Sequence, residues 1–187
     1  MVNTGLVVQK LVAFQREEIV RHLQRLSPHD RRLRFGTSVN DAAIERYVKN
    51  IDFARDDVFG IFEPDFTLSG VAHLALEPDS GTAELGLSVD PAHRGKGFGY
   101  ELLNRGKLHA QNLGYKKLYM HCLAENQIMM HLARKAGMQV VTECGEADAH
   151  VALSEATYGD LAQEFLGDQV ALIDYLLKRQ ARWFPKF

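Results

Sequence analysis

The hydrophobic and polar positions in the middle of the chain form three short strand-like stretches, one closely after another. These stretches are Asp57–Phe62, Leu68–Leu76 and Ala83–Val89, with turn-forming residues at Pro64-Asp65 and from Pro78 to Gly81. Apolar runs of this length bounded by such turns predict strands. Because the connections are short, the strands are expected to pair antiparallel. We therefore expect a three-stranded meander.

The segment before this meander predicts one strand and three helices. Residues 7–14 have a strand-like composition, and residues 15–26 carry apolar side chains at helical spacing. Ser27 followed by Pro28 is typical of a helix start, here for a short helix ending near Arg34. A further helix is expected from Asn40 or Asp41 to about Asn50.

After Val89 the apolar period changes to that of helices. Apolar residues mark one face of a helix that ends at Gly114, and Lys117–Leu123 then predicts a strand. Asn126 is placed to cap a second helix, which Gly137 ends. The order strand, helix, strand, helix is typical of the second half of an α/β domain.

The remaining residues predict two strands and a helical tail. The strands are expected at Met138–Thr142 and His150–Leu153, and the tail over about 157–187, with a break at Gly167. We expect one α/β domain over residues 1–187: a mixed, mostly antiparallel central sheet with helices on both faces and a C-terminal helical extension.

Composition and charge narrow the function classes. The 187 residues are 46% hydrophobic and 25% charged, with a formal net charge of −2, which gives no reason to expect nucleic acid or an anionic membrane as partner. The N-terminal residues do not form a secretory signal, and no apolar run could span a bilayer. Two cysteines without CxxC spacing argue against a disulfide framework and against a metal site. A cytoplasmic protein is predicted.

The stretch Arg94-Gly95-Lys96-Gly97-Phe98-Gly99 lies between a strand and a helix. A dinucleotide loop would need a third glycine where Tyr100 or Leu102 stands, and a Walker A loop would need GxxxxGK followed by Ser or Thr. The free N–H groups at a helix start and the basic side chains still predict an anion site for phosphate or pyrophosphate. The alternative is a glycine-rich turn with solvated basic residues.

This segment resembles the motif of the GNAT superfamily of acyl-CoA-dependent N-acyltransferases. Arg94, Gly97 and Gly99 match its Arg-x-x-Gly-x-Gly pattern, and Val89 and Pro91 stand where the family usually has Val and Pro. The stretch LAENQIMMHLARKAGM is similar to the family's asparagine and following helix. The resemblance is strong over residues 83–138.

The resemblance implies that acetyl-CoA is the co-substrate. Its pyrophosphate would lie on the backbone amides of the loop, and its pantetheine arm between two strands that splay apart, those ending at Val89 and running over 117–123. Val89 would pair with the pantetheine by its backbone, a form of strand addition, and Asn126 would contact it or order the cleft. The implied binding residues are Val89, Arg94, Gly95, Lys96, Gly97, Phe98, Gly99, Tyr100 and Asn126.

Glu84 is the candidate general base. Acyl transfer needs a neutral amine, and a lysine-type amine is mostly protonated at neutral pH. Glu84 shares a strand face with Gly86 and Ser88, and several family members place a glutamate on this strand. A charged residue on a solvated strand face is the alternative interpretation.

The sequence lacks the tyrosine that would act as general acid to the leaving thiolate. Many family members have a tyrosine seven residues after the asparagine, and Ala133 stands there. We assign this role to neither His131 nor His121, and Cys122 is predicted to be a core residue. The missing tyrosine keeps a second interpretation open, a non-catalytic acyl-CoA-binding sensor with the same fold.

The acceptor amine is left open between a protein lysine and a small molecule. The stretch LSPHDRRLRFG resembles a segment that lies near the acceptor site in GNAT domains of bacterial protein-lysine acetyltransferases. Its three arginines, Arg31, Arg32 and Arg34, either bind an acidic group or, as we favour, coat a solvated helix. Asp52, Asp56 and Asp57 either attract a cationic amine or belong to a charged loop. The apolar stripe of the tail, with Trp183, Phe184 and Phe187 at its end, predicts a helix that covers the sheet, shields the acceptor cleft or forms a homodimer contact.

Overall fold

A seven-stranded mixed sheet forms the centre of the molecule, in the order β1-β2-β3-β4-β5-β7-β6. The computed structural model describes residues 6–183, with side chains through residue 180. The strands are β1 (Gln9–Leu11), β2 (Asp57–Phe62), β3 (Leu68–Glu77), β4 (Thr82–Val89), β5 (Lys117–Leu123), β6 (Gln139–Glu143) and β7 (Glu146–Ala152). Only β4 and β5 pair parallel; every other neighbouring pair is antiparallel.

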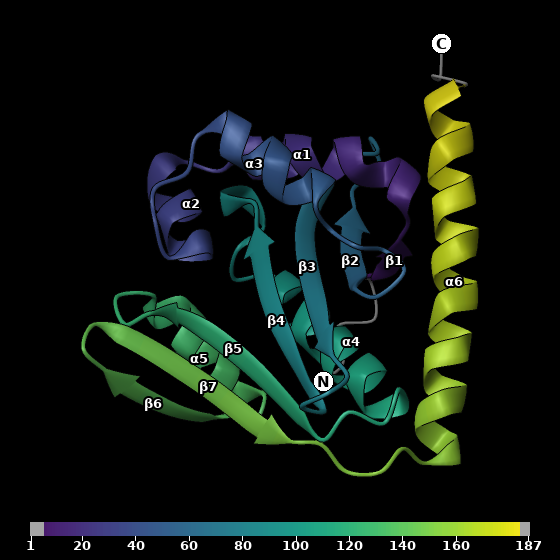
Figure 1. Ribbon diagram of the computed structural model, residues 1–187. Coiled ribbons are helices and arrows are strands. Elements are labelled where there is room, and N and C mark those ends of the chain that lie inside the picture. The colour runs from purple at the N-terminus through teal and green to yellow at the C-terminus, as the bar shows by residue number, and fades with distance from the viewer. Residues whose placement is uncertain (1–5, 184–187) are drawn as a thin grey trace.

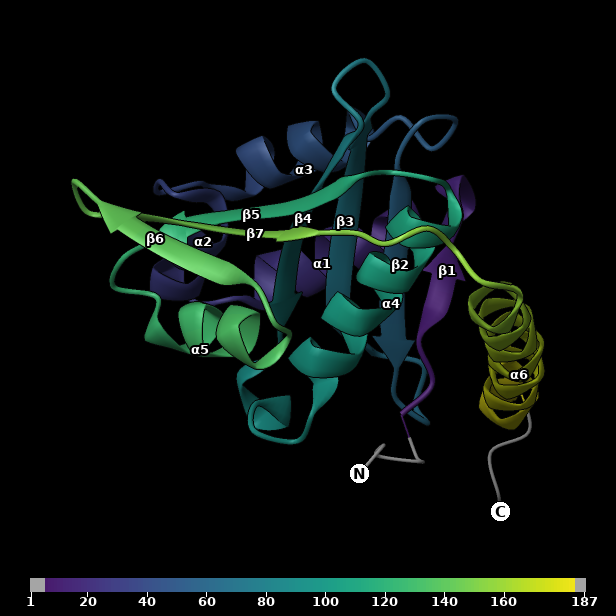
Figure 2. The ribbon, with the colours of Figure 1, turned by 90° about the horizontal axis from the view of Figure 1, so that it is seen from below.

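Helices cover both faces of this sheet (Figure 1). They are α1 (Arg16–Arg25), α2 (Pro28–Phe35), α3 (Asp41–Lys49), α4 (Phe98–Asn112), α5 (Gln127–Lys135) and α6 (Tyr158–Trp183), with short 3-10 turns at Ala13–Gln15 and Pro91–His93. In the view from below, α4 and α5 lie on one face, and α1 and α3 cross the other (Figure 2). The α/β class, the mostly antiparallel sheet and the helices on both faces are confirmed.

Two hydrophobic cores follow from the alternation of side chains along β3 and β4. Ala83, Leu85 and Leu87 point to the face that α4 covers, whereas Leu68 and Val71 point to the face that α1 and α3 cover. Because the side-chain period in a strand is two, Glu84, Gly86 and Ser88 of β4 face the side of α1 to α3. This assignment decides which helices can contact each residue near the candidate site.

The helix ends have the caps that the sequence predicts. The Ser27 side chain accepts a hydrogen bond from the Asp30 amide, with Pro28 in the first helical position of α2, and the Asn40 side chain accepts one from the Ala43 amide. Side-chain caps of this kind satisfy amides that have no partner within the helix. These contacts fix where α2 and α3 begin.

Two predicted strands had wrong boundaries. The first strand covers only Gln9–Leu11 of the predicted 7–14, because a 3-10 turn begins at Ala13. The last strand begins at Glu146 rather than His150, since Cys144 and Gly145, with φ of 50° and 88°, close a tight hairpin between β6 and β7. The mostly exposed, polar outer positions of both strands hid this hairpin from pattern analysis.

The tail forms one helix without a break at Gly167. Glu164 and Asp168 of α6 both pair with Arg105 of α4 on either side of this glycine. A glycine in a helix interior costs about 1 kcal/mol relative to alanine, which these contacts offset. The side chain of Trp183 and the whole of Phe184 and Phe187 lie outside the described residues. No helix among the described residues is long and apolar enough to cross a membrane.

Candidate acyl-CoA and acceptor site

The sheet opens between β4 and β5. The two strands pair only at Thr82 with Lys117, Ala83 with Leu118 and Glu84 with Tyr119. Beyond Glu84 the pairing stops, so the backbone edge of β4 from Leu85 to Val89 is free of a strand neighbour on this side. The expectation of a sheet splayed at this position is confirmed.

The glycine loop lies at the open end of β4 and leads into α4. Gly95 and Gly97 have φ of 73° and 92°, a left-handed conformation that L side chains rarely adopt. Gly97 is the N-cap of α4, and its carbonyl accepts the Glu101 amide at 3.0 Å. The amides of the first helical turn therefore remain available, and the helix dipole gives this end partial positive charge.

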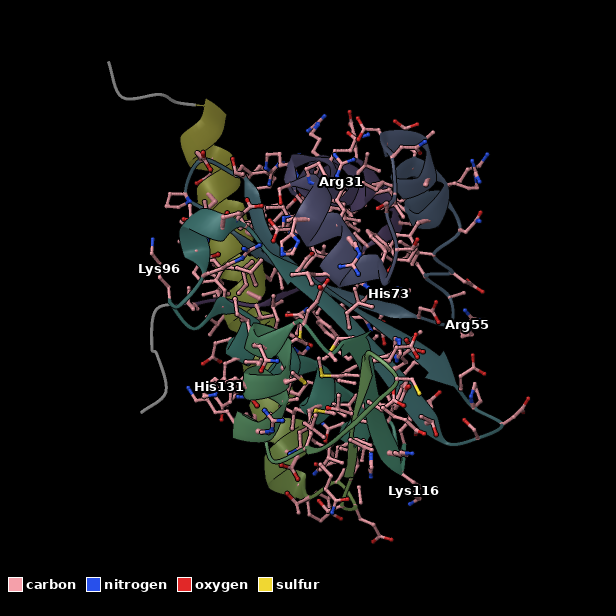
Figure 3. The ribbon with its side chains drawn as sticks, turned by 90° about the vertical axis from the view of Figure 1, so that its left-hand side faces the viewer. Arg31, Arg55, His73, Lys96, Lys116 and His131 are labelled. Atoms are coloured by element: carbon pink, nitrogen blue, oxygen red, sulfur yellow. The ribbon has the colours of Figure 1, made fainter. Side chains whose placement is uncertain are left out.

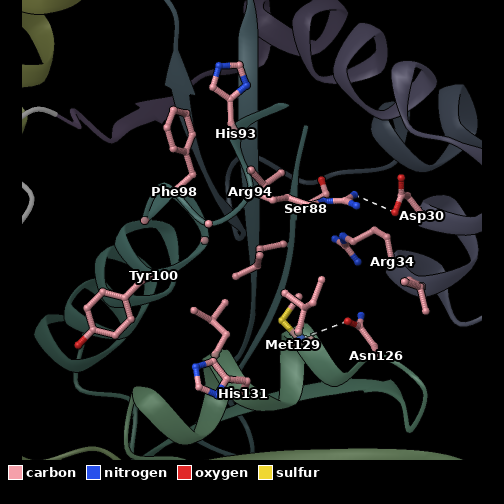
Figure 4. A pocket seen from close by; sticks show the side chains of 18 of the residues that line it. Asp30, Arg34, Ser88, His93, Arg94, Phe98, Tyr100, Asn126, Met129 and His131 are labelled. Atoms are coloured by element: carbon pink, nitrogen blue, oxygen red, sulfur yellow. Dashed lines mark hydrogen bonds and ion pairs between the residues drawn. The ribbon is translucent and has the colours of Figure 1, made fainter. Parts of the chain in front are cut away.

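A cavity of about 360 Å³ extends from this loop through the opening to α2 (Figure 4). The lining residues come from the C-cap of α1, from α2, β4 and the loop, and from α4 and α5 with the N-cap of α5. They are Leu26, Asp30, Leu33, Arg34, Leu87, Ser88, Val89, His93, Arg94, Gly95, Gly97, Phe98, Gly99, Tyr100, Asn126, Ile128, Met129, His131, Leu132 and Lys135. The cavity thus joins the two faces of the sheet.

Most of the predicted binding residues line this cavity. Val89, Arg94, Gly95, Gly97, Phe98, Gly99, Tyr100 and Asn126 lie in its wall. Lys96 does not line it and projects outward at the tip of the loop (Figure 3). A side chain at Gly99 would crowd Leu132, because its Cβ would lie 3.3 Å from the Cδ2 methyl group of Leu132. Glycine thus lets the first turn of α4 lie close to α5.

Arg94 ties the loop to α2 across the cavity. Its guanidinium lies 2.8 Å from the Asp30 carboxylate (Figure 4). Burial would raise the pKa of Asp30, but hydrogen bonds from Ser27 and Arg94 outweigh it and lower that pKa below its usual value. Asp30 therefore stays charged and holds Arg94 at the cavity wall.

Asn126 caps a helix and lines the cavity. Its side-chain oxygen caps α5 by accepting the Met129 amide at 3.1 Å, and its side chain is buried in the cavity wall. With the oxygen used by the helix, the amide N–H₂ group is the part that can donate to a ligand.

Ser88 is a cavity residue that sequence analysis missed. Its hydroxyl lies 2.9 Å from Nε2 of His22, which is completely buried. Nδ1 of His22 lies 2.9 Å from the Leu68 carbonyl, which can only accept. Nδ1 therefore carries the proton, and in neutral His22 the Nε2 atom accepts from the Ser88 hydroxyl. The only available signal was a polar residue within a strand, which does not identify a partner 66 positions away.

Glu84 lies at the point where the sheet opens, outside the cavity wall. It is exposed, and it pairs with Tyr119 at the last position before β4 and β5 separate. The Arg34 side chain covers Gly86, the next residue on the same face, so it lies between Glu84 and the Ser88 position.

The remaining candidate side chains have separate positions. His131 lies at the exposed rim of the cavity, whereas His121 bonds Asp148 at 2.8 Å, away from it. Cys122 is buried as expected, and burial raises the pKa of its thiol. Ala133 is 1% exposed and packs into the core from the inner face of α5, so the position expected for tyrosine does not line the cavity.

Among the charged residues suggested for the acceptor site, some pair with other residues away from the cavity and one lines it. Arg32 is partly exposed and pairs with Glu125, as a solvated helix face would predict. Arg31 does not fit that prediction, because it is only 14% exposed and bonds Asp41 and the backbone carbonyls of Gln24 and Leu26. Asp57 pairs with Lys10 and His109, and Asp52 lies in an exposed loop where it caps a turn. Arg34 differs, because it lines the cavity.

The chain belongs to the acetyltransferase (GNAT) family, whose model matches residues 29–138. It is 39% identical over 64 residues to the mycothiol acetyltransferase of Propionibacterium freudenreichii subsp. shermanii. That match covers 34% of this chain and only 20% of the relative's length.

Among solved structures, the fold is similar to the GNAT domain of S. lividans PAT, with a TM-score of 0.67 and 18% identity, over 78% of this chain and 89% of that one. It is also similar to the spermidine N-acetyltransferase of Vibrio cholerae solved with CoA and spermine, with a TM-score of 0.66 and 20% identity, over 82% and 98% of the two chains.

Proposed function

We propose that this chain is an N-acetyltransferase that moves an acetyl group from acetyl-CoA directly to an amine. The supporting observation is the continuous cavity from the loop at the start of α4, through the opening between β4 and β5, to α2. Residues 1–187 are taken as one acetyltransferase domain with a helical extension over about 157–187. The reaction is assigned to the cytoplasm, which suits the two free cysteines.

The residues present fit coenzyme A. The amides of residues 95–100 would hold the pyrophosphate, with Arg94, Lys96 and Lys135 contributing positive charge. The free edge of β4 at Val89 can pair with an amide of the pantetheine arm, and Asn126 can donate to it. When bound, acetyl-CoA supplies the activated acetyl thioester.

Glu84 is proposed as the general base. The new bond joins the amine nitrogen to the acetyl carbon, the thioester C–S bond breaks, and the proton of the amine passes to Glu84 directly or through water. The free thiol of coenzyme A has a pKa low enough to leave without a dedicated acid, which is consistent with Ala133 in the core.

A panel of candidate acceptor amines tests the proposed function. Peptide lysines and small amines are incubated with acetyl-CoA, and thiol release and product mass are measured. Glu84→Gln should lower kcat by about 10²-fold or more while acetyl-CoA affinity changes little. Glu77→Gln, at the exposed end of β3, is the matched control. Unchanged turnover in Glu84→Gln would show that Glu84 is not the base. Tight binding of CoA with no acetylated amine would favour the acyl-CoA sensor.

The exposed apolar side of α6 is proposed as a homodimer contact. Its large side chains, from Leu161 to Leu177, are about half exposed or more. Monomeric proteins rarely leave a continuous apolar surface of this kind uncovered.

A further inference from the structure

Arg34 is the basic residue at the α2 end of the cavity. Its guanidinium points from α2 toward the centre of the cavity (Figure 4). It occupies the space above Gly86, because a Cβ there would lie 2.5–2.6 Å from Nη1, Cζ and Nη2 of Arg34. A glycine in the middle of a strand that lets a guanidinium lie on the backbone indicates a position built for this side chain.

This guanidinium has more donors than partners. Its one hydrogen bond to a described residue runs from Nη2 to the Tyr47 hydroxyl at 3.1 Å, and among the described residues it has no carboxylate partner. The rings of Phe35 and Tyr47 lie 5.2 and 5.8 Å from Cζ. A guanidinium has five N–H donors, so four remain without a hydrogen-bond acceptor among the described residues, on a side chain that lines the cavity.

A chain of hydrogen bonds fixes Arg34 in place. The Tyr47 hydroxyl lies 2.7 Å from Nδ1 of His73, and Nε2 of His73 lies 3.2 Å from the Asp56 carboxylate. Burial and the charge of Arg34 lower the pKa of His73 below its usual value, so the ring is neutral. Nε2–H then donates to Asp56, the Tyr47 hydroxyl donates to Nδ1, and the Tyr47 oxygen accepts from Arg34. Every bond in the chain points the same way.

Asp56 anchors the far end of this chain. Arg55 holds its two oxygens at 2.7 and 3.0 Å, and the Leu76 amide contributes a third bond. Because these bonds use both oxygens of the Asp56 carboxylate, Asp56 cannot also neutralise Arg34. This chain of hydrogen bonds holds the Arg34 guanidinium rigidly at the cavity wall.

The charges around the cavity favour an anionic ligand at this end. Arg34, Arg94 and Lys135 are its cationic residues, and its one acidic residue, Asp30, pairs with Arg94. Gly86, which Arg34 covers, and Val89, at the loop end of β4, are three strand residues apart, about 10 Å along the strand. A polycation would be repelled by the cationic residues here.

We propose that the acceptor amine carries a carboxylate, and that Arg34 binds it. A planar carboxylate matches the fork of free guanidinium donors. Glu84 lies two residues from Gly86 on the same face, about 7 Å along the strand, so a bound carboxylate at Arg34 leaves the amine facing Glu84. The inference rests on the proposed acetyltransferase function and names its substrate class.

The test compares matched acceptors. The first set compares amino acids with their amides and with the corresponding decarboxylated amines. The second set compares lysine peptides flanked by Glu with lysine peptides flanked by Gln. Spermidine is included as a polycation. The first set tests free amino acids as the source of the carboxylate, and the second tests acidic peptides. In at least one set, the wild type should prefer the carboxylate-bearing acceptor by about tenfold or more in kcat/KM.

Arg34→Gln should reduce this preference to about twofold or less, while Arg32→Gln, on the same helix but paired with Glu125 outside the cavity wall, should keep it. Gly86→Ala gives an independent variant that keeps Arg34 but displaces its guanidinium, and it should lower the preference as well. An equal kcat/KM for acids and amides in the wild type, or an unchanged preference in both variants, would overturn the proposal and leave the acetyltransferase function standing.

Binding without turnover separates the two proposals. Calorimetry compares N-acetyl amino acids with their N-acetyl amides on the CoA-loaded protein. If no amine is acetylated, the acetyltransferase function fails, but tighter binding of the acids by wild type than by Arg34→Gln still supports a carboxylate site at Arg34. Equal binding of acids and amides overturns that site too.

Discussion

Ser88 and His22 form a buried polar contact at the cavity wall. His22 is 0% exposed, and its two ring nitrogens are used by the Leu68 carbonyl and the Ser88 hydroxyl. Asp90 lies 3.4 Å from Nδ1 as well, and although burial would raise the pKa of Asp90, the neighbouring His22 and Arg25 lower it. The contact joins α1 to β4 where the strand borders the cavity.

Ser88→Ala should therefore destabilise the fold. Removing the hydroxyl leaves Nε2 of His22 buried without a partner, which costs about 1–3 kcal/mol of the free energy of unfolding. Chemical denaturation followed by circular dichroism measures this loss. Ser154→Ala, in an exposed loop, should change the free energy of unfolding by less than about 0.5 kcal/mol. Equal values for the two variants would contradict the assigned contact.

Single residues also show the limit of sequence analysis. The loop from Arg94 to Gly99 was predicted because its glycines and the following helix are adjacent in the chain. The sequence named Arg34 only as one of three arginines that could bind an acidic group. It could not single out Arg34, because the position depends on Gly86, Tyr47 and His73, which come together only when α2 and α3 pack on the sheet. Three arginines on one short helix are equivalent in sequence, and tertiary pairing distinguishes them.

At the scale of elements, a partly buried charge network holds α6 against the rest of the molecule. His109 of α4 lies 2.5 Å from both Asp57 of β2 and Glu164 of α6, and Arg105 of α4 pairs with Glu164 and with Asp168. Lys10 of β1 and Asn112 of α4 complete the cluster. Burial would lower the pKa of His109, but its two carboxylate partners outweigh burial and raise it above the usual value.

The docking of α6 should weaken at alkaline pH. Because the pKa of His109 is raised in the folded protein, its contribution is complete below the unfolded value of about 6.5 and is lost as pH rises through the folded pKa. Glu164, whose pKa is lowered to about 2 despite burial, contributes above its unfolded value and loses this contribution only in strong acid. Docking is therefore expected to be tightest between about pH 5 and 6.5.

Hydrogen exchange of α6 amides, together with the Tm between pH 5 and 9, measures this dependence. His109→Gln should flatten the alkaline part of the wild-type profile, whereas His131→Gln, at the exposed cavity rim, should keep it. The same alkaline slope in wild type and His109→Gln would refute the assignment.

Elements differed in how well the sequence predicted them. The helices α2, α3 and α5 have their own capping residues, so their starts were predicted closely. The continuous α6 could not be predicted, since the contacts that carry it across Gly167 come from Arg105, about 60 positions earlier. Likewise, the hairpin at Cys144 and Gly145 lacks the Asn-Gly or Asp-Gly pair that usually announces such a turn.

At the scale of the whole molecule, α6 stands alongside the sheet with one side in contact and the other uncovered (Figure 1). Its carboxylates Asp160, Glu164 and Asp168 all bond residues of α4. The outer side carries Leu166, Val170, Ile173 and Leu177, which are 55–63% exposed. Their spacing of four, three and four residues is that of a helix–helix seam, and the occupant that such a seam fits best is the same seam of a second copy.

The dimer should therefore depend on this seam. Sedimentation velocity over a range of micromolar concentrations is expected to show a dimer for the wild type, and Ile173→Glu should shift the protein to monomer, because a carboxylate in an apolar helix contact loses its hydration without gaining a partner. Val141→Glu, on β6, changes an apolar side chain of similar exposure, 56%, outside α6, and it should leave the dimer intact. A monomeric wild type, or a dimer that survives Ile173→Glu, would refute the contact.

Binding to neutral phospholipid vesicles tests the other occupant of the seam. A monomeric wild type that binds them would assign the seam to a membrane surface. A dimer that does not bind them leaves the second copy as the occupant.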